Sequence, residues 1–216
     1  MKFNIESPLF NFITTLTEFI LLNIIFLITC LPLFTIGTSL TSLYYVTMQE
    51  ARSEHGYIVK NYLKAWKENF IQSTVIWVLY SIVSYVFFTA LIVYKGLGTI
   101  VSNVIFILIT LSTFLLVLSF LYIFPLLARF NNTTSRSIKN AMLLALHNIK
   151  TTILLVVIHC TYIYLCIILP WSKVFMVLLG FAFFAYCNSF LYTRVFKKYE
   201  PQDVNDNKSN QKFSDV

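Results

Sequence analysis

Long stretches without charge alternate with short basic segments along this chain. Residues 71–94 and 96–128 contain no Asp, Glu, Lys or Arg, and the same holds for residues 19–49, 151–172 and 174–193. An apolar helix of about 18 residues or more can cross the roughly 30 Å hydrocarbon core of a bilayer. Apolar and polar residues do not alternate here as they do in barrel strands. The pattern predicts an all-α polytopic membrane bundle of about five transmembrane helices, near residues 12–33, 71–94, 102–128, 151–170 and 174–193.

The first charge-free stretch is too long for one straight span. At about 1.5 Å per residue, residues 19–49 would reach ~46 Å. Pro32 removes a helical hydrogen bond, and Gly37 permits close backbone approach. We therefore expect a break between a span that ends near Leu33 and a second helical piece that runs toward Glu50.

This break is the strongest candidate for a functional element. Irregular backbone at membrane depth needs partners from protein or from a wet cavity. We expect the other spans to pack tightly against residues 31–42, with the Thr35 and Thr38 hydroxyls bonded to freed carbonyls. Two interpretations stay open: a tightly packed kink, and a substrate-lining break of the transporter type.

Two basic connections between spans have the pattern of amphipathic helices. In residues 57–70 and 137–150, apolar side chains recur at helical spacing, with basic residues elsewhere around each helix. The predicted apolar stripes are Ile58, Tyr62, Trp66 and Phe70 in the first connection and Ile138, Met142, Ala145 and Ile149 in the second. Such helices suit the membrane interface, with their basic residues toward lipid headgroups.

The likeness of these connections indicates a parallel repeat. A span, an interfacial helix and a second span would occur twice, at residues 12–94 and 102–170. With the fifth span at 174–193, residues 1–198 form a single integral-membrane helical domain. Residues 199–216 are rich in Asn, Asp, Gln, Ser and Lys, a composition that predicts a disordered cytoplasmic tail.

Composition and charge agree with a membrane location. Hydrophobic residues make up 58% of the chain and charged residues 12%, which argues against a soluble domain. With five spans, all Lys and Arg residues except Lys2, Lys95 and Lys173 fall on one side of the membrane. The positive-inside rule places that side in the cytoplasm, so the N-terminus faces out and the C-terminus faces in. A nucleic-acid partner is not expected, because the sequence offers no soluble basic face with groups that read or stack on bases.

Few residues are candidates for catalysis, proton transfer or metal binding. Glu18 is the only carboxylate near a span interior, where it would be hydrated, would pair with Lys95 or, less favoured, would relay a proton or substrate. His159 stands alone in the fourth span, and the four cysteines form no metal-binding pattern. The chain has no HExxH, GxSxG or phosphate-binding loop. We therefore expect no enzymatic activity, no metal and no cofactor.

Pro125 and Arg129 mark the inner end of the third span. Pro125 frees the carbonyl at about Leu121 from its helical hydrogen bond. Arg129 follows one turn later, where its guanidinium could donate to freed carbonyls or to a lipid phosphate. A simple boundary arginine is the other interpretation.

Three segments form an ordered set of motifs: residues 31–44 (LPLFTIGTSLTSLY), residues 67–72 (KENFIQ) with Asn69 and Phe70, and residues 124–130 (FPLLARF), followed by Asn140 and Asn148. In this order and spacing they resemble signatures of the YesL family of bacterial integral membrane proteins, a family of unknown function. Together the matches extend from about residue 12 to residue 192, and Trp66 stands where the family pattern would have Phe. The resemblance implies a multi-pass protein of the bacterial cytoplasmic membrane. It also implies a role around sugar uptake, because family members are commonly encoded beside carbohydrate ABC importers.

Two functions compete at this stage. The first is an accessory or scaffolding membrane protein that partners the permease or ATPase of an importer, or a second copy of itself. The second is a small transporter with a site at the Pro32/Gly37 break. The lack of ionisable pairs within the spans favours the first, whereas the broken helix and the repeat favour the second.

The orientation can be tested by cysteine labelling. We expect a single cysteine at position 95 to react with a membrane-impermeant maleimide in intact cells, and one at position 64 to react only after lysis. Labelling of position 64 from outside would overturn the orientation.

Overall fold

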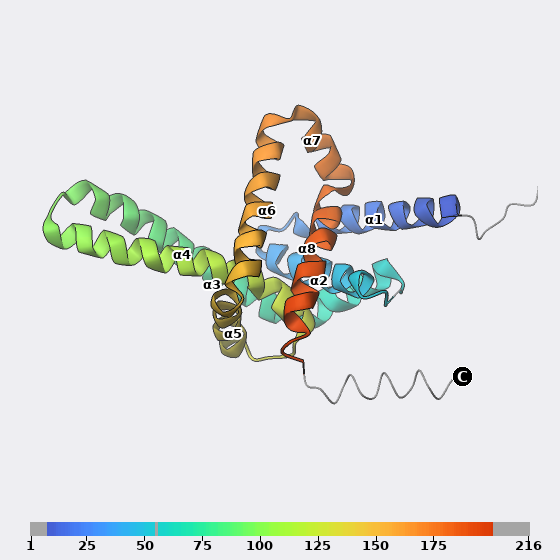
Figure 1. Cartoon of the computed structure of the whole chain (residues 1–216), viewed down its shortest axis with the longest axis horizontal. Coiled ribbons are helices and arrows are strands. Elements are labelled where there is room, and N and C mark those ends of the chain that lie inside the picture. Colours follow the sequence, from blue (N-terminus) through green and yellow to red (C-terminus); the bar gives the residue numbers. More distant parts are fainter. Residues whose placement is uncertain (1–7, 55, 201–216) are drawn as a thin grey trace, which may run out of the picture.

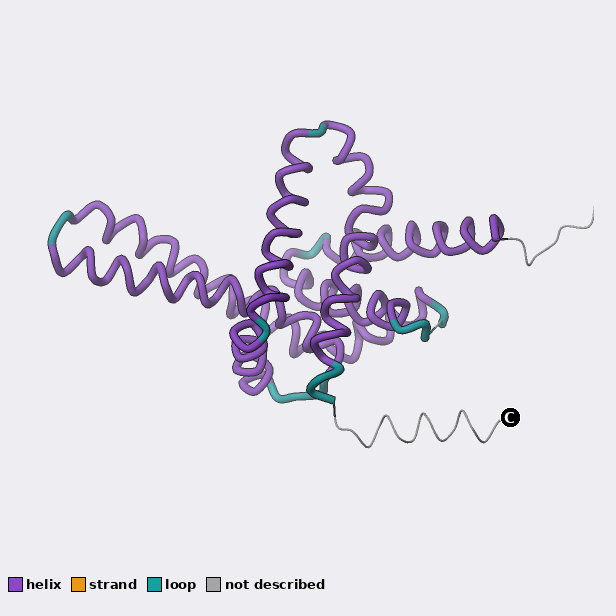
Figure 2. Tube along the Cα trace, in the orientation of Figure 1, coloured by secondary structure: helices purple, strands orange, loops and turns teal. Residues whose placement is uncertain are grey.

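The computed structural model describes residues 8–54 and 56–200, and these residues fold entirely into helices and short loops (Figures 1 and 2). The helices are α1 (Pro8–Cys30), α2 (Ile36–Ala51), α3 (Ile58–Leu97), α4 (Ile100–Arg129), α5 (Thr134–His147), α6 (Ile149–Ile168), α7 (Pro170–Phe175) and α8 (Phe181–Phe196). A 3₁₀ turn, Leu33–Thr35, precedes α2, and a π-helical segment, Met176–Gly180, joins α7 to α8. The predicted all-α fold is confirmed.

Four helical stretches are long and apolar enough to cross a membrane, judged by length and composition. They are Ile58–Leu97, Ile100–Arg129, Ile149–Ile168 and Trp171–Phe196, with Thr14–Cys30 as a shorter apolar helix. The five predicted spans correspond to these stretches. One difference concerns α3, in which the predicted interfacial helix and the following span form a single helix of 40 residues.

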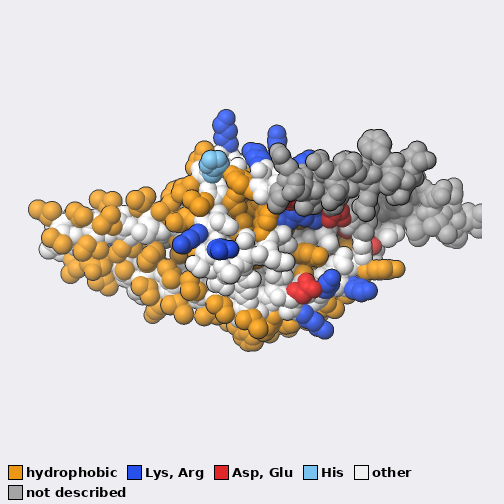
Figure 3. Space-filling model, turned by 90° about the horizontal axis from the view of Figure 1, so that it is seen from below, with side chains coloured by type: hydrophobic (Ala, Val, Ile, Leu, Met, Phe, Trp, Pro, Cys, Tyr) orange, Lys and Arg blue, Asp and Glu red, His pale blue; other side chains and the backbone are white. Residues whose placement is uncertain are grey.

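Two hairpins extend from the centre of the molecule in different directions (Figure 1). One consists of α3 and α4, and the other of α6 and α7. Between residues 81 and 117, all of them described, Ser102 alone is buried. The outer part of the α3/α4 hairpin therefore projects away from the core, with apolar side chains covering its visible surface (Figure 3).

Helix α2 lies at the centre and is the most deeply buried helix, although it is rich in hydroxyls. Ten of its 16 residues are buried. It packs against α1, α3, α4 and α8. Buried polar groups are tolerated only when they are hydrogen-bonded, so the position of α2 depends on where its hydroxyls find partners.

Those partners lie on three other helices. The Thr41 Oγ1 atom is 2.9 Å from Ser73 Oγ on α3, and Thr47 Oγ1 is 2.8 Å from Ser189 Oγ on α8. The Ser39 hydroxyl donates to Thr29 Oγ1 on α1 at 3.0 Å. The polar face of α2 thus connects helices that are far apart in the sequence.

Gly37 allows α2 and α3 to approach closely. A Cβ atom at this position would lie 2.6 Å from Trp77 Cβ and 2.7 Å from the Ser73 carbonyl oxygen. Those distances are too short for any side chain. The small residue expected at the break is therefore required by packing.

The two predicted apolar stripes differ in outcome. In the first, Ile58 and Tyr62 are buried and Trp66 packs against the core, as expected. The second stripe is partly wrong, because Met142 and Ile149 are exposed. The buried face of α5 consists of Ser137, Ala141, Leu144 and Ala145. Helix α5 packs on α4 through small residues together with Leu144, whereas Met142, Leu143 and Leu146 are exposed.

The two halves of the predicted repeat are built differently. Helix α2 stands between α1 and α3, whereas no buried helix of this kind stands between α4 and α6. The interfacial helix is continuous with its span in α3, but α5 and α6 are separated at Asn148. The repeat and the single-domain boundaries stay predictions, and tail residues 201–216 lie outside the described residues.

Replacing Gly37 by Ala should destabilise the protein by about 1–3 kcal/mol, because the added methyl group collides with the α3 backbone. Gly96→Ala is the matched control. A Cβ there meets no atom within 4 Å, so this helical substitution should be neutral or stabilise by up to ~1 kcal/mol. Gly98 is unsuitable as a control because its φ is +63°. Equal melting temperatures for both variants in detergent would contradict the close packing of α2.

Candidate functional site

The predicted break is present, and its freed backbone groups are paired. Thr35 Oγ1 donates to the Thr29 and Pro32 carbonyls at 2.6 and 2.7 Å. The Trp77 indole N–H donates to the Leu33 carbonyl at 2.9 Å. The expectation for Thr35 is confirmed, and Trp77 is a partner that the sequence did not indicate.

Part of the expectation for the break is wrong. Leu31 and Leu33 are 78% and 77% exposed, and Pro32 is exposed between them, so the other helices do not cover these three side chains. The Thr38 hydroxyl reaches α3, where it donates to the Phe70 carbonyl at 3.2 Å, and does not reach a carbonyl of the break. The start of the turn lies at the surface, and tight packing begins at Thr35, which is buried.

Asn23, a polar residue inside the first apolar helix, contacts the π-helical segment. Its Nδ2 atom donates to the Met176 and Val177 carbonyls at 3.1 and 2.7 Å, and its Oδ1 accepts from the Ala182 N–H at 3.0 Å. A π-helical turn leaves helical backbone groups without their usual partners. The Asn23 amide supplies these partners, which fixes α1 against the start of α8. The sequence feature that could have indicated this contact is the presence of an asparagine within an apolar run.

Pro125 frees the carbonyl of Leu121, as predicted, but the donor differs. The Tyr192 hydroxyl on α8 donates to the Leu121 oxygen at 2.8 Å. The Tyr192 ring packs edge-on against both Tyr44 and Tyr122.

Arg129 does not reach the freed carbonyl. Its Nε donates to Glu200 Oε1 at 2.7 Å, and Nη2 forms a salt bridge with the same oxygen. Both side chains are largely buried. The ion pair therefore holds the chain beyond α8 against the end of α4.

Asn148 lies at the joint between α5 and α6. Its side chain is buried, and Nδ2 donates to the Leu144 carbonyl at 3.2 Å and to the Tyr199 hydroxyl at 3.0 Å. The Thr152 hydroxyl also donates to the Ala145 carbonyl across this joint, at 2.8 Å. Asn148 thus connects the α5–α6 joint to the segment after α8.

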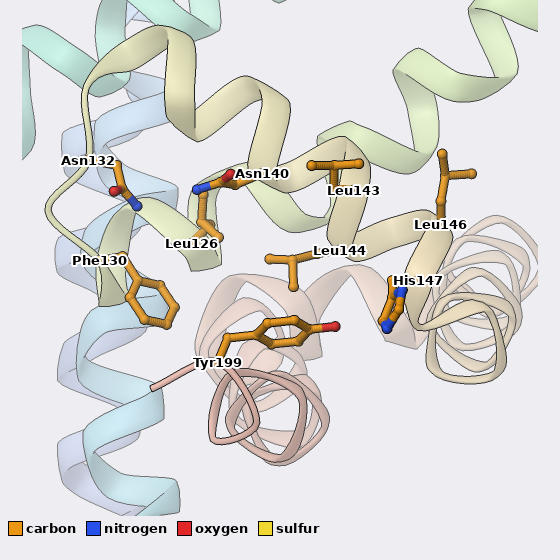
Figure 4. Close-up of a pocket in the computed structure, with 9 residues that line it drawn as sticks. All are labelled: Leu126, Phe130, Asn132, Asn140, Leu143, Leu144, Leu146, His147 and Tyr199. Carbon is orange, nitrogen blue, oxygen red and sulfur yellow. The ribbon is translucent and has the colours of Figure 1, made fainter. Parts of the chain in front are cut away.

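A cavity of about 760 Å³ opens beside this joint (Figure 4). It is lined by Leu126, Phe130, Asn132, Asn140, Leu143, Leu144, Leu146, His147 and Tyr199. In Figure 4, Asn132 and Asn140 lie at one end and His147 at the other, with leucine side chains and the Tyr199 ring between them. The structure thus brings Asn140 into a cavity with an apolar centre and polar ends.

The remaining candidates have local roles. Asn69 Nδ2 donates to the Ala65 carbonyl at 3.0 Å, and the Phe70 ring contacts the Trp66 ring at a tilt of 52°. Glu18 is half-buried on α1. It does not meet Lys95, because the α3–α4 turn and α1 extend to opposite sides of the molecule (Figure 1).

Asn188 is a further residue that sequence reasoning missed. It is fully buried on α8, and neither atom of its amide has a hydrogen-bond partner among the described residues. The four cysteines are free. In residues 8–54 and 56–200, no three His, Cys, Asp or Glu side chains lie together in a way that could hold a metal ion.

The long apolar helices and their exposed side chains indicate a multi-pass helical membrane protein. Residues 19–91, about a third of the chain, match the model of a family described as protein of unknown function, DUF624. No curated protein and no solved structure matches the chain. The matched region includes α2 and most of α1 and α3.

The hydrogen bond from Tyr192 to the carbonyl that Pro125 leaves free predicts an energetic coupling between residues 192 and 125. Tyr192→Phe should destabilise the protein by about 1–3 kcal/mol, because the Leu121 carbonyl loses its donor. With Pro125→Ala, a backbone N–H becomes available to that carbonyl, and the cost of Tyr192→Phe should fall by ~1 kcal/mol.

Tyr122→Phe is the control, because its hydroxyl contacts Thr152 and does not contact Leu121. Its cost should not depend on the residue at position 125. Denaturant unfolding in detergent measures all of these variants, and an equal cost of Tyr192→Phe in both backgrounds would refute the pairing.

Proposed function

We propose that this chain is an accessory or scaffolding protein of the bacterial cytoplasmic membrane that binds the permease of a carbohydrate ABC importer and catalyses no reaction. The observation that carries the proposal is the projecting α3/α4 hairpin. Its outer part contacts only itself within the described chain, and it presents apolar side chains over a long surface. Such a surface suits contact with the helices of another membrane protein.

The base of this hairpin has a groove suited to a partner helix. A cavity of about 330 Å³ is lined by aromatic residues and serines of α3 and by larger apolar residues of α4: Trp77, Tyr80, Ser81, Ser84, Leu116, Val117 and Phe120. Helices associate in membranes by close packing at small residues, and exposed serines permit that approach. A transmembrane helix of the permease is the occupant that this groove fits.

The remainder of the molecule supports a scaffolding role. Helix α2 and its hydrogen-bonded neighbours form a closely packed centre from which the hairpin projects. The basic side chains predict that the N-terminus faces out and the C-terminus lies in the cytoplasm. The resemblance to the YesL family supplies the link to carbohydrate uptake, which the DUF624 match does not address.

A small transporter is the alternative. The helix break at Pro32 favours it, as does the buried amide of Asn188, which has no hydrogen-bond partner in residues 8–54 and 56–200, because transporters place irregular backbone and polar groups near their substrates. The paired carbonyls of the break and the close contact at Gly37 argue against a binding site there.

Purification of the tagged full chain in a mild detergent tests the proposal. We expect importer permease and ATPase subunits to be recovered in stoichiometric amounts. Ser84→Trp fills the groove and should reduce recovery by about tenfold, equivalent to ~1.4 kcal/mol of binding free energy. Val157→Trp is the control, because Val157 is exposed on α6 and lies neither on the α3/α4 hairpin nor in the groove.

Two results would contradict the accessory role. One is the absence of importer subunits under conditions that keep the chain folded. The other is sugar flux through the purified chain in proteoliposomes, lost on Asn188→Leu, which would favour the transporter.

A further inference from the structure

The cavity between α4, α5 and the segment after α8 has the chemistry of a lipid site. Its centre is formed by Leu126, Phe130, Leu143, Leu144 and Leu146, which offer an apolar surface to a hydrocarbon chain. Its ends carry the amides of Asn132 and Asn140, the His147 imidazole and the Tyr199 hydroxyl. These groups can donate hydrogen bonds to oxygen atoms of a headgroup.

Among the described residues, no carboxylate side chain lines the cavity. The sequence contains no Asp or Glu between Glu68 and Glu200, and Glu200 is neutralised by Arg129. On α5, Arg136 is four residues before Asn140, and Lys139 is four residues before Leu143. Residues at this spacing share a helix face, so two exposed cations flank the lining residues. Figure 3 shows basic side chains spread over this face of the molecule.

We propose that this cavity binds one phospholipid with an anionic headgroup, such as phosphatidylglycerol. An acyl chain lies among the leucines, and the phosphate is held by Asn140, Arg136 and Lys139. A neutral lipid would offer the same hydrocarbon without the net charge. A soluble phosphate would leave the apolar centre empty. The inference is independent of the proposed importer partner, because it concerns a different surface.

Native mass spectrometry of the full chain tests the site, in detergent that contains equimolar phosphatidylglycerol and phosphatidylcholine. We expect one phosphatidylglycerol retained per chain, preferred by about tenfold over phosphatidylcholine. Leu143→Glu places a carboxylate in the cavity, and Met142→Glu places it on the same helix outside the lining. The two side chains are 62% and 40% exposed, so both variants should fold, and both change the net charge equally.

Loss of the retained lipid in Leu143→Glu alone supports the proposal. Equal loss in both variants would mean general attraction to a basic surface, and no loss in either would mean that the cavity holds no lipid; both results overturn it. Leu143→Gln introduces a side chain of the same size as Leu143→Glu without its negative charge. It should keep most of the lipid, and a loss as complete as that of Leu143→Glu would refute recognition of charge.

The C-terminal tail is the competing occupant, since it begins directly after Glu200 and contains one aromatic residue, Phe213. If the tail filled the cavity, Phe213→Asp in the full chain would raise lipid retention about tenfold. That result would overturn the proposal. An unchanged retention supports a lipid as the resident ligand.

Discussion

The structure depends on the burial of a polar helix inside an apolar protein. Helix α2 carries five buried Ser and Thr side chains, whose hydroxyls could not be placed among hydrocarbon groups without hydrogen-bond partners. They find these partners within α2 itself and on α1, α3 and α8. Because the partners are at fixed positions, these hydrogen bonds define which helices meet and in what register. Apolar packing alone would specify neither, since lipid tails are as apolar as leucine.

This constraint divides the molecule into a specified centre and a less constrained periphery. Around α2, polar contacts and the close approach at Gly37 leave little freedom of arrangement. The outer α3/α4 hairpin lacks such contacts to the rest of the described chain and is defined by its own two helices. A protein built in this way is suited to present a surface to another membrane component. For that reason the proposed functions involve the hairpin and the cavity beside α5, and not the centre.

The sequence predicts those features that follow from local chemistry. Charge-free length indicates the spans, Pro32 indicates the break, and Pro125 indicates a free carbonyl at Leu121. The partners of these groups cannot be predicted in this way, because they come from distant segments: Tyr192 for Leu121, and Trp77 for Leu33. The buried face of α5 was assigned only partly correctly, for a similar reason. Apolar periodicity favours Met142 and Ile149, which are exposed, whereas the buried face includes Ser137 and Ala141 beside the predicted Ala145.

Disulfide cross-linking between α2 and α8 tests the central position of α2 most directly. Thr47 and Ser189 are 142 positions apart in sequence, yet their hydroxyl oxygens are 2.8 Å apart. In a chain without native cysteines, Thr47→Cys with Ser189→Cys should form a disulfide under mild oxidation in membranes, because the two side chains face each other. Thr47→Cys with native Cys187 retained should not, since Cys187 is exposed on α8. Efficient cross-linking of the second pair, or none in the first, would contradict the burial of α2 against α8.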